Sequence, residues 1–97
     1  MLYKANDIPI DGGVFWIELS GMNIEIFYNI YENYTLATAS YYYWDEDSIV
    51  GMETEPIRRS NLTNCLRSSV KGAVNNLFIE MKKQKLSVWH SQSKPEL

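Results

Sequence analysis

The side chains that could carry covalent or metal chemistry are few in this chain of 97 residues. Its one cysteine, Cys65, and its one histidine, His90, are the candidates for a nucleophile and a base. Cys65 falls near the apolar stripe of an expected helix, where a free cysteine usually serves as a small buried hydrophobe. A zinc site would need further ligands from distant carboxylates. We therefore expect a protein that is not an enzyme and that binds no cofactor.

Two short motifs resemble ligand sites only superficially. The run Asp45-Glu46-Asp47 suggests calcium, but it lacks the spacing and the glycine of an EF-hand loop. The pair Gly12-Gly13 stands before an expected strand, whereas a phosphate-cradling glycine motif opens a helix. We interpret the acidic run as a solvated loop, and we expect neither a metal site nor a phosphate site.

The two signs of charge are segregated along the chain. Residues 1–57 hold ten acidic residues against one lysine, and residues 58–97 hold eight basic residues against two acidic ones, for a net charge of -3. Such asymmetry bears on the choice of partner. Because the acidic half would repel a phosphate backbone, we expect little direct nucleic-acid binding. The expected partner is a basic protein, such as a nucleic-acid-binding protein or complex.

The first half of the chain alternates between apolar and polar residues, which is typical of strands. Strands are expected from Val14 to Ser20 and from Asn23 to Tyr31, joined by a type II′ turn at Gly21-Met22. That register predicts the core-face pairs Leu19 with Ile24, Ile17 with Ile26 and Phe15 with Tyr28, and the outward pairs Trp16 with Phe27 and Glu18 with Glu25. Like charges in direct opposition weaken a sheet, so Glu18 and Glu25 indicate a surface that presents negative charge, unless lysines from the helix end or the tail neutralise them.

A third strand follows the turn at Glu32-Asn33, which sets Tyr31 opposite Tyr34, and its alanines would let a helix approach closely. A fourth strand is expected from Ile49 to Ile57, where Pro56 favours an edge position.

From about Ser60 onward the apolar residues recur with a helical period, and Ser60 or Asn61 is the expected N-cap. The sequence thus predicts an α+β fold, an antiparallel four-stranded sheet in the order β-β-β-β-α with one C-terminal amphipathic helix packed on one face. We expect one domain over residues 1–85, followed by an extended tail over residues 86–97.

The outward face of the predicted sheet combines aromatic rings with carboxylates. The same combination occurs in the run Tyr41 to Asp47, which Glu53 and Glu55 follow. Aromatic side chains give large contact area at low entropic cost, and carboxylates are strong acceptors for Arg and Lys. The expected partner-binding residues are Trp16, Glu18, Glu25, Tyr42, Trp44, Asp45, Glu46, Asp47, Glu53 and Glu55.

In size, architecture and charge the chain resembles small phage-encoded anti-defence proteins, including anti-CRISPR inhibitors of the DNA-mimic type. The resemblance rests on Asp45-Glu46-Asp47, Glu53, Glu55, Glu18 and Glu25, and the basic residues 58–97 depart from it. It implies a non-catalytic inhibitor that presents an acidic and aromatic surface to a basic site on a target protein. Bacterial toxin-immunity proteins have a similar build.

We expect a monomer or a homodimer, and the alternative from another class is a self-associating structural subunit that forms a homodimer. In that reading Trp16, Phe27 and Tyr31 are buried between copies and the acidic half of one copy meets the basic helix of the other. The start of the chain lacks the apolar segment of a signal peptide, and no apolar run reaches the roughly 20 residues that span a bilayer. We expect a cytoplasmic protein, in a bacterial host cell if it is phage-encoded.

Overall fold

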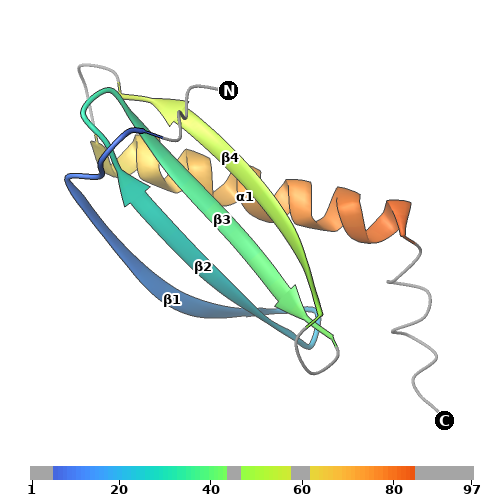
Figure 1. Cartoon of the computed structure of the whole chain (residues 1–97). Coiled ribbons are helices and arrows are strands. Elements are labelled where there is room, and N and C mark those ends of the chain that lie inside the picture. The colour runs from blue at the N-terminus through green and yellow to red at the C-terminus, as the bar shows by residue number, and fades with distance from the viewer. Residues whose placement is uncertain (1–5, 44–46, 58–61, 85–97) are drawn as a thin grey trace, which may run out of the picture.

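The computed structural model describes residues 6–43, 47–57 and 62–84, which form one antiparallel sheet and one helix. The strands are β1 (Asp11–Leu19), β2 (Met22–Ile30), β3 (Tyr34–Tyr42) and β4 (Ser48–Pro56), and they lie side by side in chain order. The helix α1 (Leu62–Lys83) packs across one face of the sheet, behind the strands in Figure 1. We call this the inner face and the opposite one the outer face. The expected α+β fold is confirmed.

The register of the first hairpin, between β1 and β2, differs from the expected one by two residues. Its two central residues are Ser20 and Gly21, both with positive φ (51° and 77°), which fits a type I′ turn and not a type II′ turn at Gly21-Met22. Strand β1 also begins earlier than expected, at Asp11, and includes Gly12-Gly13. The pairs are Trp16 with Glu25, Glu18 with Asn23, Val14 with Phe27, Phe15 with Ile26 and Ile17 with Ile24.

The predicted direct oppositions of Glu18 with Glu25 and of Trp16 with Phe27 are therefore wrong. All four side chains nevertheless stay on one face, because side chains alternate with a period of two and a shift of two residues in register preserves the face. The assignment of outward residues on β1 and β2 thus holds, although the neighbours across the strands change.

The other pairings follow the sequence closely. Strands β2 and β3 pair Ile24 with Tyr41 and Ile30 with Thr35, which is the predicted register. Strand β4 pairs with β3 and lies at the edge of the sheet, where Pro56 ends it without breaking a central ladder. The expected caps, Ser60 and Asn61, and the tail over residues 86–97 lie outside the described residues.

The core lies between α1 and the inner face of β2, β3 and β4. Small residues make it thin: Ala37 and Ala39 are fully buried beneath the helix, and the sequence prediction of a close approach is confirmed. A Cβ atom added at Gly51 would collide with the α1 backbone at Ala73 and Leu77. Larger buried side chains surround this contact, and they are Met22, Ile24, Ile26, Tyr41, Ile49, Leu77 and Met81.

The helix does not sit over the middle of the sheet. It contacts mainly β4 and β3 and touches β2 only slightly. The inner-face residues of β1 are consequently left open, with Phe15 40% exposed and Leu19 39% exposed. Figure 1 shows β1 as the outermost strand on the side away from β4.

Candidate functional site

The outer face of the sheet carries an apolar area that no described element covers. Its five members come from all of the strands and are between 41% and 57% exposed. We call it the outer-sheet patch, and it consists of Val14, Trp16, Phe27, Tyr42 and Val50. Scattered exposed apolar residues are ordinary, but a contiguous group of this kind on one face is typical of an interaction site.

A three-residue contact lies at the centre of the outer-sheet patch. The rings of Trp16 on β1 and Tyr42 on β3 approach each other across β2, with their centroids 6.4 Å apart and a tilt of 42°. Beneath them lies Glu25, which pairs with Trp16 across the strands and accepts a hydrogen bond of 2.7 Å from the Tyr42 hydroxyl. The Glu25 carboxylate is thus bonded to one of two exposed aromatic rings that contact each other, and its strand position is next to the other.

The contact also changes the acidity of the phenol. The hydrogen bond to Glu25 raises the pKa of Tyr42 above the ordinary value of 10.0, and burial and the charge of Glu25 act in the same direction. A hydrogen bond with Ser40, the buried neighbour of Glu25 on β3, acts against the shift. Tyr42 therefore keeps its proton at neutral pH and remains a donor to Glu25.

The described cations all lie on the helix side of the molecule, whereas carboxylates lie on both faces of the sheet. The four strands contain five carboxylates and no lysine or arginine. All of the cations in the described part of the chain belong to α1, on the inner side, and they are Arg67, Lys71, Lys82 and Lys83. Neutralisation of Glu18 and Glu25 by the described helix lysines is therefore excluded by position.

Glu18 is exposed on the outer face, opposite Asn23, and extends the negative charge toward the Ser20-Gly21 turn. Asp47 is also exposed and immediately precedes β4, where its carbonyl accepts a hydrogen bond from the Tyr43 amide. Trp44, Asp45 and Glu46 lie outside the described residues.

Glu53 and Glu55 do not join this surface. They pair with Ala37 and Thr35, which places them on the inner face beside the helix. Glu53 lies against Gly72, and its Oε1 accepts a hydrogen bond of 3.0 Å from Asn76. The Asn76 amide also donates to the Met52 carbonyl at 2.6 Å, so Glu53 takes part in the contact that holds β4 against α1.

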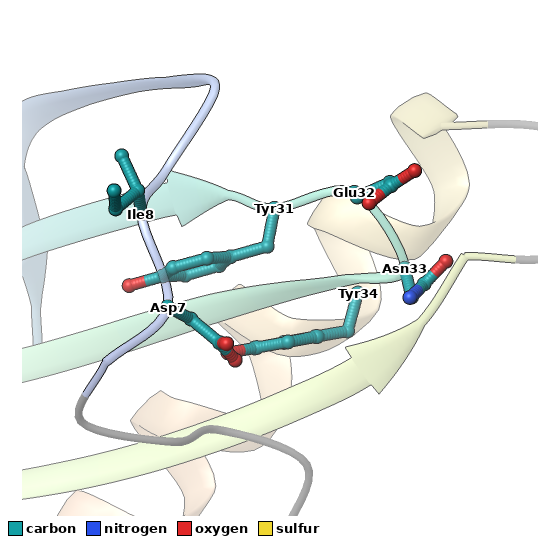
Figure 2. Close-up of a pocket in the computed structure, with 6 residues that line it drawn as sticks. All are labelled: Asp7, Ile8, Tyr31, Glu32, Asn33 and Tyr34. Carbon is teal, nitrogen blue, oxygen red and sulfur yellow. The ribbon is translucent and has the colours of Figure 1, made fainter.

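A second part of the outer face is covered by the segment before β1, which the sequence reasoning missed. Tyr31 and Tyr34 stack with centroids 4.6 Å apart, as expected for a cross-strand pair, but each is only 5% exposed. The Tyr34 hydroxyl donates to Asp7 at 2.6 Å, and Ile8 lies beside the rings (Figure 2). A small pocket of about 170 Å³ remains there. Tyr31 is therefore buried within the chain and does not belong to an open surface.

Cys65 and His90 were the candidates for covalent or metal chemistry. Cys65 is buried, and its thiol donates to the Pro56 carbonyl at 3.4 Å. His90 lies outside the described residues. Within residues 6–43, 47–57 and 62–84, no group of three or more Asp, Glu, Cys or His side chains is placed to hold a metal ion, and no helix has the length and apolar character to cross a bilayer.

No protein-family model matches the chain, and comparisons with curated proteins and with solved structures give no significant match. The site is therefore interpreted from its own geometry.

Proposed function

We propose that the protein is a non-catalytic inhibitor that binds a basic site on a target protein through the outer-sheet patch and its carboxylates. The target class that fits this chemistry is a cytoplasmic nucleic-acid-binding protein or complex, of the kind that phage-encoded anti-defence proteins block. The chain would occupy a surface that otherwise contacts phosphates.

The observation that carries this proposal is the Glu25 carboxylate, bonded to Tyr42 and paired across the strands with Trp16, on a face without described cations. An arginine of the target can stack its guanidinium plane on an indole and pair with a carboxylate at the same time. Tryptophan, tyrosine and arginine are also the residues that dominate interface energetics. A rigid strand position lowers the entropic cost of presenting them.

Two further features support a binding role without catalysis. The thiol of Cys65 is committed to a contact between α1 and the end of β4. The titratable group with a raised pKa on the outer face, Tyr42, is bonded to a carboxylate that lies on a flat sheet surface. This arrangement suits recognition of a cation more than activation of a nucleophile.

The experiment is affinity capture from a bacterial lysate with the whole chain as bait. The test variant is Trp16→Ser with Glu25→Gln, and the matched control is Ile79→Ser with Glu80→Gln on α1, where Ile79 is 51% exposed. The proposal expects a basic protein that the wild type and the control retain, that the test variant loses, and that high salt elutes. Equal retention by the test variant, or loss with the helix control, would contradict the proposal.

The loop after Tyr42 is tested separately by replacing Asp45, Glu46 and Asp47 with Ser. For well-paired carboxylates we expect each replacement to weaken binding of the captured protein by about 1 to 3 kcal/mol. An unchanged affinity would remove the loop from the binding surface and leave the outer-sheet patch as the remaining candidate. The melting temperature should stay that of the wild type.

A further inference from the structure

Strand β1 is an edge strand without the usual protection. It lies at the end of the sheet order, so one side of its backbone has no strand beside it among the described residues. Its apolar side chains are open on both faces: Val14 (51%) and Trp16 (57%) on the outer face, Phe15 (40%) and Leu19 (39%) on the inner face. A long apolar edge of this kind is a template for pairing with another strand.

The opposite edge, β4, has an exposed apolar side chain only on the outer face, where Val50 is 41% exposed. Strand β4 is covered on its inner face by α1, with Ile49 and Gly51 buried. It also carries Glu53 and Glu55 and ends at Pro56, which are devices that discourage edge-to-edge pairing. Of the two edges of this sheet, β1 is thus the one available for association.

The inner side of β1 adjoins an apolar groove of about 260 Å³. Phe15 forms one wall of the groove, and residues of the first three turns of α1 form the other. The helix-side residues are Thr63, Leu66, Arg67 and Val70. Because α1 lies over β3 and β4, the groove is on the β2 side of Phe15, and Phe15 itself faces the free edge of β1.

We propose that β1 pairs antiparallel with β1 of a second copy of this chain across a two-fold axis, so that the two sheets join into one of eight strands. Phe15 is the middle residue of the nine in β1, so an axis at Phe15 lets the whole strand pair with itself. Both helices then lie on the same side of the joined sheet, and the Phe15 side chains of the two copies meet at the axis on that side.

The sequence of β1 is complementary to itself in this register. Ile17 of each copy lies opposite Gly13 of the other, and Glu18 lies opposite Gly12, so bulky side chains meet glycines. Val14 lies opposite Trp16 on the outer face. Glu18 is placed three residues from the axis in each copy, which separates the like charges, whereas an axis at Glu18 would oppose them directly.

Tyr28 supplies a surface for the incoming Ile17. Its hydroxyl lies 2.6 Å from where a Cβ of Gly13 would stand, so the ring extends over the glycine toward the free edge. Phe15 contacts the same ring from the other side, with centroids 6.1 Å apart. In the proposed dimer Ile17 would pack on the Tyr28 ring above Gly13.

The proposal does not depend on the proposed function. Pairing through β1 leaves Trp16, Glu25 and Tyr42 on the outer face and brings two outer-sheet patches side by side. It differs from a dimer in which the acidic sheet of one copy meets the basic helix of the other. Because a single-strand contact buries less than the roughly 1,200 Å² of a stable interface, we expect a weak dimer that depends on protein concentration.

The test is sedimentation of the whole chain from micromolar to millimolar concentration, at ionic strengths of about 0.15 M and about 1 M. The wild type should shift from monomer to dimer at both ionic strengths. Phe15→Lys and Phe15→Glu should each weaken the dimer by more than about tenfold, because equal charges then meet on the axis, and a mixture of the two variants should restore it. Val50→Lys and Val50→Glu, at the opposite edge, are the matched controls and should leave the dimer unchanged.

A wild-type monomer at millimolar concentration would overturn the proposal, as would a dimer that high salt dissociates and that the Phe15 variants retain. Hydrogen exchange of the wild type gives a test that needs no variant. Amides of β1 should gain protection as the protein concentration rises. If protection rose only in β4 or α1, or did not rise at all, the proposal would also be overturned.

Discussion

The Tyr42 hydroxyl donates a hydrogen bond of 2.7 Å to Glu25, a carboxylate on the neighbouring strand that also pairs with Trp16. Through side chains, this contact joins three of the four strands, β1, β2 and β3, which are also joined by backbone hydrogen bonds. It leaves both rings about half exposed, with Trp16 57% and Tyr42 45% accessible. A surface that is ordered before it meets a partner loses less entropy on binding.

The contact should be visible in the titration of Tyr42. Because the hydrogen bond to Glu25 is the main cause of the raised pKa, Glu25→Gln should move the pKa of Tyr42 back toward 10.0. Seven tyrosines are present, so the measurement is a site-resolved NMR titration of the ring carbons. An unchanged Tyr42 pKa in Glu25→Gln would show that the contact does not form in solution.

The same shift makes stability depend on pH in the alkaline range. A pKa that is raised in the folded state contributes stability that is fully present below the unfolded value and is lost as the pH rises through the folded value. The wild type should therefore lose stability more steeply above about pH 10 than Tyr42→Phe does. Urea unfolding at neutral and alkaline pH compares the two proteins, and parallel pH profiles would contradict the assignment.

The first turn holds a correctable strain. Ser20 has a φ of 51°, in a region that asparagine adopts more readily, and Asn-Gly is the preferred pair for a type I′ turn. Ser20→Asn should raise the free energy of unfolding by some tenths of a kcal/mol to about 1 kcal/mol. Gly21→Ala, where φ is 77°, should lower it. Chemical denaturation measures both, and a stabilising Gly21→Ala would argue for a different turn.

Two glycines between β4 and α1 should respond to alanine to different extents. In Gly51→Ala the new methyl group meets the helix backbone at Ala73 and Leu77, so we expect a loss of about 1 to 3 kcal/mol or more. In Gly72→Ala it meets the Cγ and Cβ of Glu53, so that side chain and its hydrogen bond from Asn76 must shift. The helix gains up to about 1 kcal/mol of propensity, which offsets part of this cost, and we expect a smaller loss than in Gly51→Ala. The melting temperatures of the two variants are the measurement. A Gly51→Ala variant as stable as the wild type would contradict the close approach of α1.

Much of the fold follows from periodicity. The Glu32-Asn33 turn fixed the register of β2 and β3 because shifting the hairpin would have scattered the apolar set. The first hairpin was misjudged because Ser20-Gly21 and Gly21-Met22 both place glycine at an allowed position. The residues assigned to the outer face were right despite this error, but the predicted cross-strand partner of Glu25 was wrong. Its partner is Trp16, and this pair is the basis of the candidate site.

The remaining differences come from tertiary contacts that leave no periodic signal. Phe15 and Leu19 have the pattern of a covered inner face, yet α1 lies over β3 and β4 and leaves them exposed, whereas Ile17 between them packs partly buried against the core. On β4, alternation does not reveal which set faces the helix, since Gly51 is buried while the more apolar Val50 is exposed.

The central claim is that the outer-sheet patch recognises cationic protein surface, and an NMR titration with an arginine-rich peptide tests it most directly. The account predicts the largest shifts at the Trp16 indole and at the amides of Glu25 and Tyr42, weakened in Trp16→Ser with Glu25→Gln and absent with a glutamate-rich peptide. Largest shifts at Glu53 and Glu55, or equal shifts in the variant, would contradict it.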